Sequence, residues 1–199
     1  MKKWTLWAIT FILGMILLTG GGGDAKKETP AATSKQKIVV GLDDLFPPMG
    51  FRNEKNEIVC FDIDMAKEAS KRMGMEMEFK AIDWASKEAD LKSGLVDMLW
   101  NGLTMLEERK KNILFSKPYM GNKQIVVIKK GNSITSKDGL KGKVVAVQDD
   151  SSAVTALGKE KSVADTFKEL KKYPALISAL LDLGNGRVDV LIVDEVLAR

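Results

Sequence analysis

One short pattern occurs twice in this chain: a glycine at the end of a helix, two residues, an aspartate and a buried strand. Residues 93–99 read Ser-Gly-Leu-Val-Asp-Met-Leu, and residues 185–191 read Asn-Gly-Arg-Val-Asp-Val-Leu. Strands that alternate with helices favour a largely parallel sheet covered by helices. The duplication therefore predicts an α/β fold with two similarly built lobes, although two unrelated helix–glycine–strand units would share so short a pattern.

The same alternation continues along most of the chain from Ile38 onward. Apolar and β-branched runs predict strands, and 3.6-residue spacing that ends at a glycine predicts helices. A proline-containing stretch, residues 43–51, predicts a loop. Strands are expected at residues 38–41, 57–61, 75–79, 96–100, 124–128, 143–147 and 188–193. Helices are expected at 64–74, 87–92 and 175–183, with further helix starts at 107–108 and 151–152. We place the first lobe at residues 38–120 and the second at 121–199.

Composition narrows the classes of function. A chain of 199 residues that is 45% apolar can bury the core of one domain or two small lobes. The net charge of +4 falls to +2 once Lys2 and Lys3 are left out, and basic residues are interleaved with acidic ones. That distribution predicts no nucleic-acid partner.

Two residue counts limit the chemistry. The sequence has no histidine, which excludes Ser-His and Cys-His nucleophile pairs and histidine-ligated metal sites. Its single cysteine, Cys60, excludes an intrachain disulfide and lies in an apolar run, where a small buried side chain is expected. We expect no cofactor and no metal site.

The first 23 residues have the features of an export signal. Lys2 and Lys3 precede a mostly apolar run, residues 4–18, and small residues follow. Fifteen residues at about 1.5 Å each are too short for a hydrocarbon core of about 30 Å. We predict a signal peptide at 1–23, followed by a disordered linker at 24–37 that has little apolar surface to bury.

Residues 17–20, Leu-Leu-Thr-Gly, resemble the front of a bacterial lipoprotein signal. Gly21 stands where the lipidated cysteine would be, and without a thiol no lipid anchor forms there. Either the chain is released after export, or a natural cysteine has been replaced at this position.

Polar residues follow the strand of each repeated unit. Asn101 and Gly102 form a turn after the first, Thr104 adds a hydroxyl, and Asp194 follows the second. Ligands of open α/β sheets bind at the carboxyl ends of strands. The planar fork of Arg109 suits an α-carboxylate and Asp194 suits an α-ammonium, which predicts an amino acid site. The alternative is an ordinary strand, turn and helix start in which Arg109 pairs with a neighbouring glutamate.

Several segments together resemble the bacterial polar amino acid-binding proteins of ABC importers. The segments are residues 43–51, 61–64, 83–84, 100–109, 115–119 and 193–195. The resemblance implies the two-lobed, type II periplasmic-binding-protein-like fold, which closes on a free amino acid and delivers it to a membrane permease. It implies that Arg109, the Gly102 backbone and Thr104 hold the carboxylate, that Asp194 binds the amino group, and that Phe46 and Trp84 enclose the side chain. Asp43, Asn101, Gln148 and Ser151 also match pocket positions, the first and the last two more loosely.

This sequence departs from the family pattern in two places. Cys60 replaces a glycine that commonly precedes the Phe-Asp-x-Asp segment. Family members also continue beyond the position that corresponds to Arg199 and return to complete the first lobe. We therefore expect the C-terminal part of the first lobe to be missing, with apolar surface exposed.

Two other classes of function remain open at this stage. An enzyme of the cyclohexadienyl or arogenate dehydratase type would use the same scaffold, with Asp43, Asp44 or Asp194 as proton carriers. A sensory ligand-binding module would need a spanning helix or a signalling domain, and neither is found in this sequence. We expect extracytoplasmic binding rather than catalysis.

Overall fold

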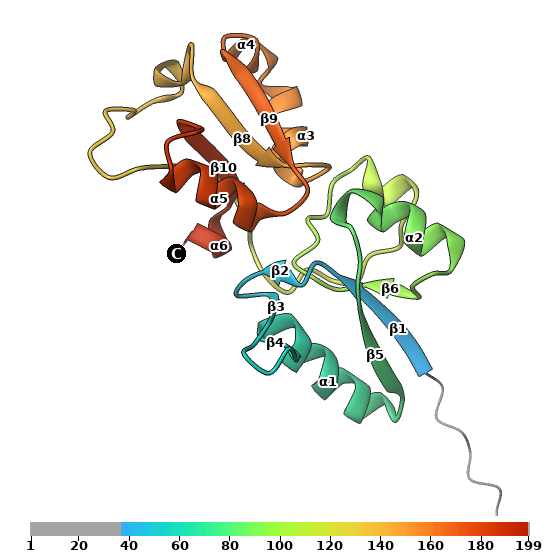
Figure 1. The fold of residues 1–199 in the computed structure, drawn as a ribbon. Helices are drawn as coiled ribbons and strands as arrows, with labels where there is room; N and C mark the ends of the chain where they lie inside the picture. The colour runs from blue at the N-terminus through green and yellow to red at the C-terminus, as the bar shows by residue number, and fades with distance from the viewer. Residues whose placement is uncertain (1–36, 199) are drawn as a thin grey trace, which may run out of the picture. The chain divides into compact units, whose positions relative to one another are not determined.

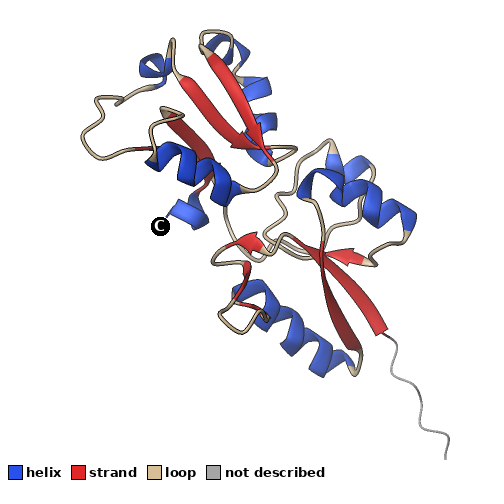
Figure 2. Cartoon of the chain, viewed as in Figure 1, coloured by secondary structure: helices blue, strands red, loops and turns tan. Residues whose placement is uncertain are grey.

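Two sheets, one from each half of the chain, carry the fold (Figures 1 and 2). The computed structural model describes residues 37–198. The predicted signal peptide and the linker up to residue 36 lie outside these residues, as does Gly21. Among the described helices, none combines the length and the apolar character that a membrane crossing requires.

The N-terminal sheet is fully parallel. Its central strand β1 (Lys37–Leu42) pairs with β5 (Glu76–Ala81) on one side and β6 (Met98–Leu99) on the other. The helices of this half are α1 (Phe61–Met73) and α2 (Lys87–Ser93), the latter after a 3₁₀ turn, η1 (Trp84–Ser86). The core of this half contains Val40, Leu42, Ile63, Ala66 and Val96, all at most 1% exposed.

The C-terminal sheet has four strands in the order β7-β10-β8-β9, with β7 antiparallel to β10 and the other pairs parallel. The strands are β7 (Gln124–Ile128), β8 (Val144–Gln148), β9 (Glu169–Tyr173) and β10 (Val190–Asp194). Alternate side chains face opposite sides of a strand. Accordingly, Val190 and Ile192 belong to the core with α3 (Ser152–Lys159), whereas Leu191 and Val193 belong to the core with α5 (Leu176–Gly184).

The duplicated pattern has the same geometry in both halves, which confirms the comparison made from the sequence. The amide of Asp97 donates to the Val39 carbonyl and its carboxylate accepts from the Val39 amide, both at 2.8 Å. Asp189 makes the same two bonds with Val144, at 2.9 and 2.8 Å. Each aspartate thus fixes the start of its strand against the neighbouring strand of the sheet.

The glycine of each copy is in the left-handed region, with φ of 77° at Gly94 and 72° at Gly186. Glycine enters this region without the steric cost of a Cβ atom. The amide two residues later donates to the carbonyl of Asp90 in the first copy and of Asp182 in the second, both at 3.4 Å. The chain therefore turns from helix to strand in the same way twice.

Several local predictions were wrong. The predicted loop at residues 43–51 contains β2 (Leu45–Phe46) and β3 (Gly50–Arg52), which form a small antiparallel sheet with β4 (Ile58–Val59). Strands of two or three residues are too short to show a periodic pattern. The helix α1 begins at Phe61 rather than at residue 64, and Cys60 precedes it at a φ of 103° instead of lying in a strand.

The helix expected to begin at Glu107 and Glu108 is also wrong. Only a single 3₁₀ turn, η2 (Arg109–Lys111), forms there. The side chain of Arg109 turns inward at this point, where it is buried and bonded to three groups. Five further elements were not predicted: η1, β9, η3 (Lys137–Leu140), α4 (Lys161–Ala164) and α6 (Glu195–Ala198).

Candidate functional site

Polar groups from the carboxyl ends of strands in both sheets surround one small cavity, which we call the polar cavity. Nine of the ten predicted site residues line it, together with Ser152: Phe46, Trp84, Asn101, Gly102, Thr104, Arg109, Gln148, Ser151 and Asp194. The tenth, Asp43, lies behind Gln148, whose side-chain amide donates to the Asp43 carboxylate at 2.6 Å. The open space between these groups is only about 10 Å³, so an amino acid enters only if the walls separate.

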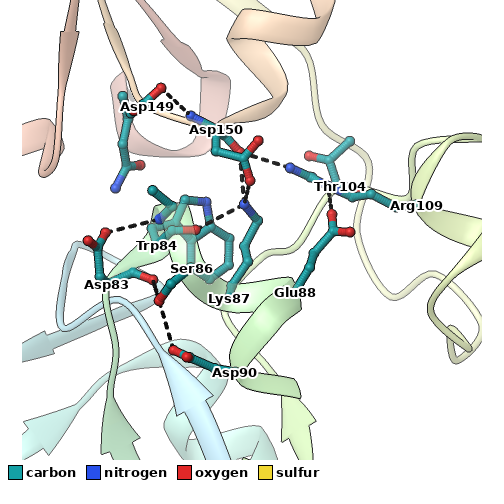
Figure 3. A network of polar contacts seen from close by, with 12 residues as sticks. Asp83, Trp84, Ser86, Lys87, Glu88, Asp90, Thr104, Arg109, Asp149 and Asp150 are labelled. Carbon is teal, nitrogen blue, oxygen red and sulfur yellow. Dashed lines mark hydrogen bonds and ion pairs between the residues drawn. The ribbon is translucent and has the colours of Figure 1, made fainter. Parts of the chain in front are cut away.

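Arg109 forms one wall and is only 5% exposed. Its Nε donates to Glu88 at 3.1 Å, its Nη1 to the Thr104 carbonyl at 3.3 Å, and its Nη2 to the Asp150 carbonyl at 3.0 Å (Figure 3). A guanidinium has five N–H donors, so two remain for a carboxylate. The alternative in which Arg109 pairs with a glutamate is thus partly right, but the partner comes from α2 and not from the adjacent chain.

Asp194 ends β10 and forms another part of the lining. One of its carboxylate oxygens, Oδ1, accepts hydrogen bonds from Gln124 Nε2 at 2.5 Å, from Ser152 Oγ at 3.3 Å and from Asn122 Nδ2. These donors fix the plane of the carboxylate. The other oxygen, Oδ2, has no hydrogen bond from residues 37–198, which leaves an acceptor suited to an ammonium group.

A chain of hydroxyl groups connects the two charged residues. Thr104, whose carbonyl accepts from Arg109, donates through its own hydroxyl to Ser152 Oγ at 3.3 Å, and Ser152 donates to Asp194. Ser152 was not predicted. Ser151 precedes α3, as expected, but its hydroxyl makes no capping bond and is buried without a partner in the described part of the chain.

Phe46 and Trp84 are the two aromatic groups of the lining. Phe46 is 5% exposed and also packs in the core beside α5, so its side chain belongs to the core as well as to the cavity. Trp84 is 9% exposed, and its ring lies under the ammonium of Lys87, 5.2 Å from the ring centroid. Both rings are therefore held in place by other parts of the chain.

Asp43 is a buried aspartate whose hydrogen bonds connect the two halves of the chain. Its carboxylate accepts from Gln148 and from the Leu45 amide, and its own amide donates to Asn101. Burial raises the pKa of Asp43, while the bond from Gln148 opposes this shift. Because the carboxylate is tied to Gln148, it joins residues from the two halves rather than lining the cavity itself.

Comparison with known proteins identifies the family. Residues 38–180 match the bacterial extracellular solute-binding proteins, family 3. The chain belongs to this family. Its members are extracellular, so the working location of this protein is outside the cytoplasm.

Named relatives are identical to this chain at about a third of the aligned residues. The arginine-binding extracellular protein ArtP of Bacillus subtilis is 31% identical over 100% of this chain and 75% of its own length. The L-cystine-binding protein TcyJ of Escherichia coli is 31% identical over 81% of this chain and 60% of its own length. The names of both describe binding proteins rather than enzymes.

Solved structures show the same fold. An ancestral arginine-binding protein bound to arginine is 39% identical, with a TM-score of 0.77 over 83% of this chain and 73% of that one. A substrate-binding protein of an ABC uptake transporter from Streptococcus pneumoniae with bound histidine is 35% identical, with a TM-score of 0.79 over 81% and 67%. The resemblance seen in the sequence is confirmed, and with it the two-lobed, type II periplasmic-binding-protein fold.

A larger cavity of about 600 Å³ adjoins the polar cavity and has a mainly apolar lining. It is bordered by β6 and by residues 112–120, a segment without helix or strand in which Leu114 is fully exposed. Arg109 is not part of its lining. The pair of opposite charges that suits an amino acid therefore meets in the polar cavity and not in the larger one.

A hydrogen-bonded pair of a buried aspartate, Asp62, and a partly exposed tyrosine, Tyr119, supports the turn at Gly102. The Tyr119 hydroxyl donates to the Asp62 carboxylate at 2.9 Å and accepts from the Gly102 amide at 3.2 Å. Asp62 is fully buried in the first turn of α1, and this burial raises its pKa. The bond from Tyr119 opposes that shift because it stabilises the ionised carboxylate.

Replacing Tyr119 by phenylalanine is expected to lower the free energy of unfolding by about 1.5–3 kcal/mol at pH 7, the usual worth of a hydrogen bond to a charged group. Without its donor the pKa of Asp62 rises further, so the loss is present where the carboxylate is ionised and shrinks as the pH falls towards 4. Urea denaturation of both proteins at pH 7 and pH 4 measures this difference.

Tyr173→Phe is the matched control. Tyr173 donates to Asp182 at 2.7 Å, but Asp182 keeps Arg187 as a second partner and has access to solvent. We expect a loss well below that of Tyr119→Phe. Equal losses in the two variants, or a Tyr119→Phe loss that does not change with pH, would contradict the role given to the Asp62 pair.

Proposed function

We propose that this protein binds one free L-amino acid between Arg109 and Asp194 outside the cytoplasm and delivers it to the permease of an ABC importer. The observation that carries the proposal is the presence of both residues in the lining of one cavity, with Thr104 and Ser152 between them. The free N–H groups of Arg109 take the α-carboxylate, and the carboxylate of Asp194 takes the α-ammonium. Thr104 and the Gly102 backbone assist Arg109.

Binding proceeds by closure of two lobes, residues 38–120 and 121–199. Arg109 and Thr104 belong to the first lobe, whereas Ser152 and Asp194 belong to the second. Open and closed arrangements differ by little free energy, and a ligand that contacts both walls favours the closed one. The narrow space of about 10 Å³ in the polar cavity supports this order of events, since the lobes must separate before an amino acid enters.

The side chain of the ligand lies between Phe46 and Trp84, with Gln148 and Ser151 at the rim. Relatives are named for arginine, histidine and cystine, and one ancestral arginine-binding protein has also been solved with glutamine. We therefore propose a ligand with a polar or basic side chain, arginine being the first to test.

Export of the protein depends on residues 1–23, and residues 24–37 connect the signal to the folded part. Gly21 in place of the lipidated cysteine makes release from the membrane the proposed outcome for this sequence.

The protein binds its ligand without turnover. Burial raises the pKa of Asp43, one of the carboxyl groups considered for acid–base chemistry, but this group is bonded to Gln148 behind the cavity.

A thermal-shift panel of the twenty amino acids tests the proposal. A ligand that binds only the native state raises the melting temperature, and the shift grows with the logarithm of the ratio of its concentration to its Kd. We expect one amino acid, or a few with related side chains, to raise it, with the same ligand recovered unchanged after prolonged incubation. No shift by any of the twenty, or loss of the ligand during incubation, would overturn the proposal.

A further inference from the structure

Lys87 is a fully buried lysine at the start of α2. Its side chain is 0% exposed, and lysine is among the residues least often buried unless it is paired. Its ammonium donates to the Trp84 carbonyl at 3.0 Å, to the Asp150 carbonyl at 2.9 Å and to the Asp150 carboxylate. All three N–H groups are thus used, one within the first lobe and two on a residue of the second lobe.

Asp150 lies in the turn between β8 and α3 and has an unusual backbone. Its φ of 49° is in the left-handed region, which aspartate enters more readily than most residues. In this conformation both its carbonyl and its carboxylate bond to Lys87, and the carbonyl also accepts from Arg109 Nη2 (Figure 3). Two cationic side chains of the first lobe, Lys87 and Arg109, therefore donate hydrogen bonds to Asp150 of the second lobe.

The two charged side chains of this ion pair, Lys87 and Asp150, are buried to different extents. Lys87 has no exposed surface, whereas the side chain of Asp150 is 54% exposed. Burial lowers the pKa of Lys87, and the bond that its ammonium donates to the Asp150 carboxylate opposes this shift. The lysine consequently depends on the aspartate while the lobes are together, but the aspartate remains in contact with water if the lysine is removed.

We propose that the Lys87–Asp150 pair is a latch between the lobes that stabilises the closed arrangement whether or not an amino acid is bound. Neither residue lines the polar cavity, so the pair acts on the closure equilibrium and not on the ligand directly. The inference rests on the proposed division into two lobes. It does not depend on which amino acid binds, or on whether one binds.

The unequal burial predicts an unequal effect of the two substitutions. Asp150→Gly removes the carboxylate and suits the positive φ, but leaves a buried ammonium without its counter-charge in the closed arrangement. Lys87→Met removes the buried charge itself and fills a similar volume, while the half-exposed Asp150 is solvated by water. We therefore expect Asp150→Gly to open the lobes more than Lys87→Met does.

The test measures the distance between spin labels on the two lobes without added amino acid. Labels at Lys71→Cys in α1 and Lys168→Cys, both exposed positions, in a Cys60→Ser background report on the closure. We expect Asp150→Gly to raise the ratio of open to closed molecules about tenfold or more, and Lys87→Met about threefold or less. Asp150→Asn, which keeps the shape of the side chain, should raise the ratio as well.

The double variant Lys87→Met/Asp150→Gly should resemble Lys87→Met alone, because the uncompensated ammonium is gone. Glu160→Gln is the matched control, since Lys137 and Glu160 form an ion pair at 2.7 Å inside the second lobe, and it should leave the distances unchanged. Unchanged distances in both Asp150 variants, or a larger opening in Lys87→Met than in Asp150→Gly, would overturn the latch. Because the measurement needs no ligand, such a result is distinct from a failure of amino acid binding.

Discussion

Arg109→Ala is expected to weaken amino acid binding by about 2–5 kcal/mol, the range seen when one partner of a buried, hydrogen-bonded charge pair is removed. Arg109 is 5% exposed and three of its N–H groups are bonded within the protein, so its two free donors point from a fixed position. A fixed donor pair loses little conformational entropy when a carboxylate binds. Isothermal titration calorimetry with the amino acid found in the thermal-shift panel measures the loss.

Two further variants serve as controls. One separates the bidentate geometry of the Arg109 guanidinium from its charge, and the other removes an arginine outside the site. Arg109→Lys keeps the charge without the bidentate geometry, and we expect a smaller loss than for alanine. Arg187→Ala removes an exposed arginine that pairs with Asp182, and it should leave the affinity unchanged. Wild-type affinity in a folded Arg109→Ala protein would remove Arg109 from the site.

Asp194→Asn is the second substitution with a large expected effect, again about 2–5 kcal/mol of binding free energy. The amide keeps the shape of the carboxylate but loses the charge that balances an ammonium. Its oxygen would take the place of Oδ1 and keep the bonds from Asn122 and Gln124, so its NH₂ group would take the place of Oδ2 and face the ammonium. Calorimetry gives the loss for the same amino acid as above.

A ligand without an amino group tests the assignment of Asp194 more closely. The desamino analogue of the bound amino acid should bind the wild-type protein weakly, and Asp194→Asn should change its affinity little. The two changes then fail to add, as expected when both remove one contact. A full additional loss for the analogue would show that Asp194 acts elsewhere than on the ammonium.

Much of the architecture was predictable because the chain carries strong periodic patterns. The strand at 124–128 and the helix around residues 175–183 were placed almost to the residue. The duplicated units predicted two similar α/β halves, and their strand ends predicted that Arg109 and Asp194 would approach one another. Both residues line the polar cavity, as the positions of these strand ends predicted.

Three features could not be predicted from the sequence, each for a physical reason. The strand β9, Glu-Leu-Lys-Lys-Tyr, is at the edge of its sheet, where charged residues are common, so it lacks the apolar run of a buried strand. Gln124 reaches Asp194 because they face each other in the β7–β10 pairing, a register that a sequence does not show. Lys87 has the appearance of a solvated residue at a helix start, and only the approach of Asp150 from the other half explains its burial.

A crystal structure of the protein with the amino acid that gives the largest thermal shift would show directly whether Arg109 and Asp194 hold the ligand between them. We expect the α-carboxylate within about 2.7–3.2 Å of the free N–H groups of Arg109 and the α-ammonium on the carboxylate of Asp194. The side chain should lie between Phe46 and Trp84. An amino acid bound in the apolar cavity beside β6, or one that contacts neither Arg109 nor Asp194, would contradict this expectation.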